Sequence, residues 1–277
     1  MTPQLQTNLK RLNLSGLLST LEVRLLEATS NQLSPLEFLE LLVADEIQAR
    51  NDRAIARRIK DAGFRQIKRL EDFDFSFNAS IPKRRIFELA VGHLVREKRD
   101  LLLIGPPGVG KSHLVQALGY QYARMGFSVL YRSVFDAVGD LMQAESFQEQ
   151  QKTLRRYLRP DVLCIDDMGL KNLPRHGGEL LFEIIMCRFE VRTTIMTSNR
   201  PLEDWGALVG DVPTATAILD RFLSRAEIFS ITGRSYRIQG RVDQTASDPG
   251  PEAKNGPEAE ARVTTSPRKK EKEQCSG

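Results

Sequence analysis

The sequence predicts an α/β fold, in which a three-layer domain with a parallel sheet follows a small all-α domain and precedes a disordered C-terminal tail. Two patterns indicate this. Beyond residue 100, short apolar runs alternate with helical periodicity, which is typical of parallel strands covered by helices on both faces. Before residue 64, leucines recur at helical spacing. The length of 277 residues allows one large and one small domain, at about 100–200 residues per domain.

Residues 1–69 are expected to form the small helical domain. Leucines recur every three or four residues between Leu9 and Leu26, which predicts helices with one apolar side. A further helix is expected to begin at Ser34, because a serine cap, a proline and Glu37 form a typical helix start. Gly63 is the expected end of this helix. Such a region could not form a large core alone.

Residues 70–240 are expected to form the α/β domain. It opens with Leu70–Phe75, an aromatic and acidic segment without a clear period, and a helix is expected after Pro82. Trp205 is expected to be a packing anchor. The predicted strands are the short apolar runs Leu101–Ile104, Ser128–Tyr131, Val162–Ile165, Thr193–Thr197 and Glu227–Ile231.

Residues 241–277 contain no Leu, Ile, Phe, Tyr or Trp, so we expect them to be disordered. No apolar run approaches the ~20 residues of a membrane span, and no signal peptide is expected at the N-terminus. Cys164, Cys187 and Cys275 are too far apart for a zinc motif or a disulfide framework. These features favour a reduced, cytoplasmic protein with no membrane partner.

The motif G-x-x-x-x-G-K-S indicates a functional site. It lies between a predicted strand and a predicted helix. Its glycines let backbone N–H groups turn towards phosphates at a helix N-terminus. Lys111 is expected to contact the β- and γ-phosphates of ATP, and Ser112 to offer its hydroxyl to Mg²⁺. His113 is a candidate nucleotide contact for which we expect packing rather than catalysis. The motif residues are Gly105, Pro106, Pro107, Gly108, Val109, Gly110, Lys111 and Ser112.

Two carboxylates, Asp166 and Asp167, follow the apolar run Val162–Ile165. A magnesium ion bound to the phosphates also needs a carboxylate on its other side. Because side chains alternate in direction along a strand, the two carboxylates are expected to point different ways and to have two roles. We expect Asp166 to hold Mg²⁺ through water and Asp167 to orient or polarise the attacking water.

Three further residues are candidates. Asn199 follows a predicted strand at the sheet edge where ligands of parallel sheets bind, so it could contact the γ-phosphate or the attacking water. Arg221 is expected on a helix, either reaching the γ-phosphate of a neighbouring subunit or forming a surface ion pair. Arg237 either binds the nucleotide of its own subunit or has no such role.

Taken in order, these residues resemble the IstB-type ATP-binding transposition helpers, which are relatives of the DnaC-type helicase loaders in the AAA+ superfamily. The resemblance runs from about Leu9 to Arg237. Its most specific stretches are Leu70–Phe75, Gly105–Leu114, Leu163–Gly169, Thr197–Asn199, Trp205-Gly206, Ile218–Phe222 and Gly233–Arg237. Ser112 stands where many members of the family have threonine. The resemblance implies nothing about the tail, residues 241–277.

The resemblance implies an AAA+ ATPase that binds ATP with Mg²⁺, hydrolyses it slowly and forms homo-oligomers on double-stranded DNA. It implies that this ATPase stimulates a partner IstA-type transposase of the same insertion element. It further implies that Arg221 is a trans-acting arginine finger, that Asn199 is the first sensor and that Leu70–Phe75 flanks the adenine pocket. Two alternatives remain: a helicase loader, and a nucleotide-gated adaptor without significant turnover.

The basic residues are concentrated in one stretch. The net charge is +4, but residues 50–69 alone hold eight basic and two acidic residues, so the rest of the chain sums to −2. Arg50, Arg53, Arg57 and Lys60 share one helical face, with Arg58 beside them. Such a stripe predicts salt-sensitive, largely sequence-independent contacts with DNA phosphates, and the alternative is a solvated helix face.

Overall fold

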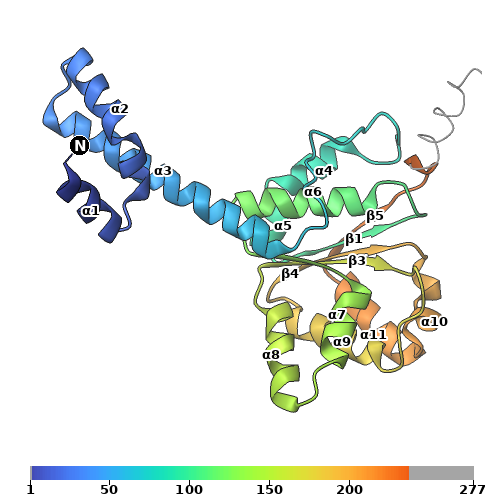
Figure 1. Cartoon of the computed structure of the whole chain (residues 1–277). Coiled ribbons are helices and arrows are strands. Elements are labelled where there is room, and N and C mark those ends of the chain that lie inside the picture. The colour runs from blue at the N-terminus through green and yellow to red at the C-terminus, as the bar shows by residue number, and fades with distance from the viewer. Residues whose placement is uncertain (1, 237–277) are drawn as a thin grey trace, which may run out of the picture. The chain divides into compact units, whose positions relative to one another are not determined.

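The computed structural model describes residues 2–236, and Figure 1 shows the arrangement of their helices and strands. The predictions for Arg237 and for residues 241–277 therefore lie outside the described residues. The elements are α1 (Pro3–Arg11), α2 (Ser15–Asn31), α3 (Pro35–Ala62), α4 (Lys83–Ala90), α5 (His93–Arg96), β1 (Asp100–Ile104), α6 (Lys111–Arg124), β2 (Val129–Ser133), α7 (Val134–Met142), α8 (Phe147–Leu158), β3 (Val162–Met168), α9 (Gly177–Arg188), β4 (Thr193–Ser198), a 3-10 turn (Leu202–Asp204), α10 (Trp205–Val209), α11 (Val212–Leu223) and β5 (Ala226–Ser230).

Helix α3 begins and ends where its cap residues predict. At its start, the Ser34 hydroxyl accepts from the N–H of Glu37 at 3.3 Å, and the Glu37 carboxylate accepts from the N–H of Ser34 at 2.7 Å. At its end, Gly63 has a φ of 68°, a conformation in which glycine avoids the steric cost of a side chain. Both boundaries of the helix were thus predictable from local residues.

The first three helices share only a small core. Leu9, Leu21 and Leu42 are buried together. Glu46 of α3 is also buried, and its carboxylate accepts from the N–H of Gly16 at 2.7 Å, so α3 caps the start of α2. The leucine periodicity overstated this core, because Leu26 is 72% exposed.

The five strands form one parallel sheet in the order β2-β3-β4-β1-β5. Alternate residues of each strand enter different cores: Leu101 and Leu103 pack with α4, α5 and α6, whereas Leu102 packs with α7 to α11. Figure 1 shows these two groups of helices on opposite faces of the sheet. The predicted three-layer α/β architecture and all five predicted strands are therefore confirmed.

Trp205, at the start of α10, is fully buried in the second of these cores. Its indole N–H donates to the hydroxyl of Ser198 at 3.3 Å, at the end of β4. The packing role predicted for this tryptophan is confirmed, and the contact fixes the strand end directly before Asn199. Within residues 2–236, no helix is long and apolar enough to cross a membrane.

Candidate functional site

The glycine-rich loop joins β1 to α6 in a conformation that requires glycine. Gly108 and Gly110 have φ angles of 85° and 102°, which residues with side chains rarely adopt. A Cβ atom on Gly110 would also lie 2.7 Å from the ring of Phe73. The loop ends at the N-terminus of α6, where backbone N–H groups and the helix dipole favour an anion. This geometry fits a phosphate group.

Lys111 and Ser112 begin α6, and their side chains already have partners. The Lys111 ammonium donates to the carbonyls of Gly105 and Pro106 at 2.7 and 2.8 Å. A phosphate oxygen would be a stronger acceptor than these neutral carbonyls. The Ser112 hydroxyl donates to a carboxylate oxygen of Asp166 at 3.1 Å. Two hard oxygen ligands of the kind that Mg²⁺ prefers are therefore side by side.

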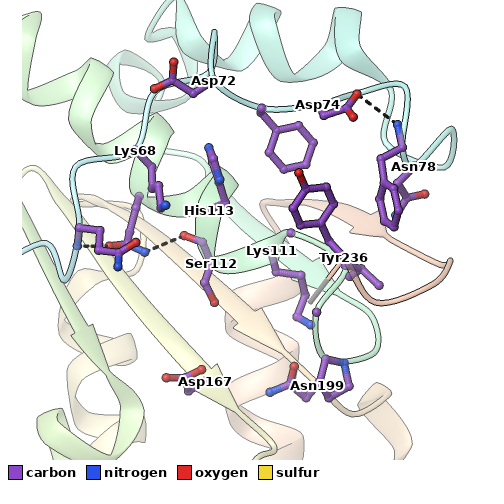
Figure 2. Close-up of a pocket in the computed structure, with 18 of the residues that line it drawn as sticks. Lys68, Asp72, Asp74, Asn78, Lys111, Ser112, His113, Asp167, Asn199 and Tyr236 are labelled. Carbon is purple, nitrogen blue, oxygen red and sulfur yellow. Dashed lines mark hydrogen bonds between the residues drawn. The ribbon is translucent and has the colours of Figure 1, made fainter. Parts of the chain in front are cut away.

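A cavity of about 640 Å³ lies over this loop. Figure 2 shows Lys111 and Ser112 in its middle, with Asp167 and Asn199 on one side and Asp72 and Tyr236 on the other. Its volume is within the range of small-molecule sites. It is lined by Gln66, Lys68, Asp72, Phe73, Asp74, Phe77, Asn78, Pro107, Gly108, Val109, Gly110, Lys111, Ser112, His113, Gln116, Asp167, Leu170, Asn199 and Tyr236.

Aromatic rings form the wall of the cavity opposite Asp167. The rings of Phe73 and His113 meet edge to face at 5.0 Å, and those of Phe77 and Tyr236 do so at 4.9 Å. Burial lowers the pKa of His113, which favours its neutral form and suits packing against Phe73. A wall of this kind offers flat, mostly apolar surfaces on which a nucleotide base can rest.

Asp166 is fully buried and lies behind Ser112 rather than on the cavity surface. Besides the serine, the hydroxyls of Thr197 on β4 and Tyr131 on β2 donate to its carboxylate. Hydroxyls from three separate elements thus fix this carboxylate beside the serine. The Ser112 hydroxyl and the Asp166 carboxylate fit the predicted magnesium site, because both are hard oxygen groups and phosphate and water can fill the other ligand positions.

Asp167 lines the cavity, so the two carboxylates do point different ways. The cause is a break in the strand and not simple alternation. The pairing of β3 with β4 shifts between Ile165 and Met168, and Asp167 has a φ of 68°. Such a conformation is strained for an aspartate and is typical of functional positions. One Asp167 carboxylate oxygen lies 2.8 Å from the guanidinium of Arg65.

Of the remaining predicted residues, Asn199 joins the cavity and Arg221 does not. Asn199 lines the cavity, and its backbone N–H donates to the carbonyl of Met168 at 2.8 Å, which ties β4 to the end of β3. Arg221 is exposed on α11, with its guanidinium 5.8 Å from the ring centre of Phe189. It does not line the cavity over the glycine-rich loop.

The predicted basic stripe lies on α3, but part of it is engaged. Arg50 and Arg53 lie 2.7 and 3.4 Å from the carboxylate of Glu46, the residue that caps α2. Arg57 lies 3.6 Å from Asp61. Lys60 is exposed and Arg58 is half-buried. Arg50 and Arg53 therefore help to hold the helical region together as well as presenting charge.

Several residues of the site were not singled out from the sequence. Phe77, Asn78 and Tyr236 line the cavity, and Arg65 and Tyr131 contact the two aspartates. The only sequence signal for the aromatic wall was the run of aromatic and acidic residues at Leu70–Phe75. The other contacts join segments far apart in the chain, for which one sequence carries no local signal.

Comparison with known proteins agrees with this geometry. The family model described as "IstB-like ATP binding protein" matches residues 7–244. The chain is 36% identical over 212 residues to a Geobacillus stearothermophilus protein named as an ATP-binding protein of insertion sequence IS5376, covering 76% of this chain and 84% of that one. It is 34% identical over 236 residues to a Pseudomonas aeruginosa protein named in the same way for insertion sequence IS21, covering 85% and 89%. The crystal structure of DnaI has a similar fold, with a TM-score of 0.50 and 23% identity over 60% of this chain and 91% of that one.

Proposed function

Because this chain belongs to the family of IstB-like ATP-binding proteins and has an AAA+ fold, we propose that it hydrolyses ATP to regulate transposition of an insertion element. In this proposal the protein assembles into homo-oligomers on double-stranded DNA and stimulates a partner IstA-type transposase. Residues 1–69 contact DNA and the partner, and residues 70–240 form the ATPase. The main support is the convergence of Lys111, Asp167 and Asn199 on one cavity.

The substrate is ATP, with its phosphates at the loop and its base against the aromatic wall. Backbone N–H groups at the start of α6 and the Lys111 ammonium bind the β- and γ-phosphates. Ser112 and Asp166 would hold Mg²⁺, which supplies positive charge to the phosphate oxygens. Phe73 and Tyr236 orient the base and exclude water from one side of the cavity.

Hydrolysis needs a water molecule in line with the γ-phosphate. Asp167 and Asn199 line the cavity on the same side and are suited to orient that water. The oxygen of the water attacks the γ-phosphorus, the bond from this phosphorus to the β-phosphate oxygen breaks, and ADP, inorganic phosphate and a proton of the water leave. Turnover that requires Mg²⁺ and increases with duplex DNA would support this function, whereas no turnover with both present would contradict it.

Arg221 is the proposed trans-acting residue, since it is exposed and separate from its own cavity. Arg221→Ala protein is expected to bind ATP normally but to lose about 10³-fold or more in turnover, the size of an arginine-finger effect. Mixing it with Lys111→Ala protein should restore part of the activity, because an intact cavity of the first variant can then lie next to an intact Arg221 of the second. Turnover of the mixture at different ratios measures this. A mixture no more active than its components would contradict the trans role.

The DNA contact is best tested on residues that lie beyond the Glu46 network. Replacing Arg57, Arg58 and Lys60 with glutamine is expected to weaken duplex binding and to lower the slope of log affinity against log salt by about 2–3. Fluorescence anisotropy with a labelled duplex at several salt concentrations measures both. The control replaces three exposed basic residues in α8 and at its C-terminal end, namely Lys152, Arg155 and Arg159. Equal losses in the two triple variants would contradict a specific role for α3.

A further inference from the structure

The ion pair between Arg65 and Asp167 joins the helical region to the hydrolytic side of the cavity. The guanidinium lies 2.8 Å from the Asp167 carboxylate oxygen Oδ2, and the two residues are 102 positions apart in the chain. The same guanidinium lies 6.0 Å from the ring centre of Tyr131, whose hydroxyl donates to Asp166. Arg65 therefore contacts Asp167 directly and is linked to Asp166 through Tyr131, although it is not part of the wall of the nucleotide cavity.

Arg65 follows α3, the helix that carries the basic stripe, closely in the chain. Arg65 is the second residue after Gly63, where α3 ends. Phe64, between these two residues, packs against the core that α4, α5 and α6 form with the sheet. Its ring centre lies 6.2 Å from that of Tyr131. This anchor keeps the backbone of Arg65 near Asp167, and the long side chain can still turn because it is 53% exposed. A movement of the guanidinium needs no unfolding of the anchor.

A second cavity beside Arg65 can accommodate its guanidinium after the guanidinium leaves Asp167. Arg65 lines this second, open cavity of about 320 Å³, which Arg132 and Arg156 also line. The acidic residues of this cavity are Asp136 and Asp140, and Arg156 is paired with Asp140 at 3.2 Å. Among the residues that line this cavity, three guanidinium groups face two carboxylates, so the cavity has an excess of positive charge once Arg65 leaves Asp167. A DNA phosphate reaching the end of the α3 stripe would meet this charge at Arg65.

From this geometry we propose that Arg65 is a positioning residue that holds Asp167 away from the attacking water until a DNA phosphate takes the guanidinium. The inference rests on the proposed function, in which Asp167 orients that water. A carboxylate oxygen that accepts a charge-assisted hydrogen bond from Arg65 is less able to accept one from water. Binding of duplex DNA along α3 thereby increases hydrolysis through a single side chain.

The size of the effect follows from the exposure of the pair. Ion pairs with an exposed partner contribute up to about 1 kcal/mol, which at 1.4 kcal/mol per tenfold is about a fivefold change in population. Removing the guanidinium is therefore expected to raise turnover by about two- to fivefold, and not by orders of magnitude. Because the ion pair is this weak, a DNA phosphate can replace Asp167 as the partner of the Arg65 guanidinium.

The test compares full-length variants in steady-state ATP hydrolysis with and without duplex DNA. Arg65→Ala is expected to raise kcat without DNA by about two- to fivefold and to leave KM for ATP unchanged, so that the remaining stimulation by DNA falls by the same factor. Arg65→Lys, which keeps a cation beside Asp167, should behave like the natural protein. Arg69→Ala is the matched control, because Arg69 is an exposed arginine in the same segment between α3 and α4 and has no ion-pair partner among residues 2–236. This variant should leave kcat without DNA unchanged.

Two further measurements separate this inference from the proposed function. The double variant Arg65→Ala with Asp167→Asn should be as inactive as Asp167→Asn alone, because the release acts only through Asp167. If the natural protein turns over ATP through Asp167 but Arg65→Ala does not raise kcat without DNA, the inference is wrong and the ATPase function stands. If the natural protein does not turn over ATP, or Asp167→Asn does not impair it, the proposed function fails and the inference fails with it.

Discussion

Lys111→Ala protein is expected to bind ATP at least about 100-fold more weakly than the natural protein, a loss of about 2.8 kcal/mol or more. The reason is that the ammonium at the start of α6 is the only charged donor that the glycine-rich motif itself contributes. Hydrogen bonds between charged groups are the strong ones, and the low exposure of Lys111, at 5%, reduces screening by water. Titration with a fluorescent ATP analogue in the presence of Mg²⁺ measures the affinity.

The control must separate binding from folding, because Lys111 also donates to the carbonyls of Gly105 and Pro106. Thermal unfolding without nucleotide shows whether the loop and helix α6 survive the substitution. Lys152→Ala, which removes an exposed lysine from α8, is the matched variant and should bind ATP normally. A folded Lys111→Ala protein that binds ATP as tightly as the natural one would remove this loop from the nucleotide site.

Asp167→Asn protein is expected to bind ATP normally and to hydrolyse it about 10²- to 10⁴-fold more slowly, because a neutral amide cannot polarise the attacking water as a carboxylate does. Asparagine has the same shape, and its carbonyl oxygen can still accept from Arg65, so the local packing is kept. The loss therefore falls on kcat and not on KM. Single-turnover hydrolysis combined with an ATP titration separates the two quantities.

Asp166→Asn is the informative comparison for this variant. Asp166 is buried and its carboxylate accepts from the hydroxyls of Ser112, Thr197 and Tyr131. An asparagine there would place its NH₂ group against at least one of these hydroxyls, which then loses its acceptor. We expect the Asp166→Asn protein to lose thermal stability as well as turnover, whereas the Asp167→Asn protein keeps the unfolding temperature of the natural protein. Unchanged turnover in Asp167→Asn would take that residue out of the hydrolytic step.

The elements that could be predicted are those whose cause is local. Helix α3 is bounded by a capping box at Ser34 and a glycine at position 63, both within a few residues of the ends they determine. Strands β1 and β3 contain the continuous apolar runs Leu101–Ile104 and Val162–Ile165, because helices cover both faces of the sheet. The exposed Leu12 and Leu26 show where periodicity alone overstates a core, because it counts apolar residues and not the surfaces available to cover them.

Residue types and spacing in the sequence alone were enough to indicate a phosphate-binding loop, two acids after a buried strand and a polar residue after another. These follow from short-range backbone geometry, which neighbouring residues set. Only the tertiary structure decided that Phe73, Phe77 and Tyr236 wall one cavity, that Asp167 turns into it at a break in the strand, and that Arg65 lies against Asp167. Each of these contacts joins segments brought together by packing on the sheet, so its geometry depends on the whole core and has no signature in any one segment.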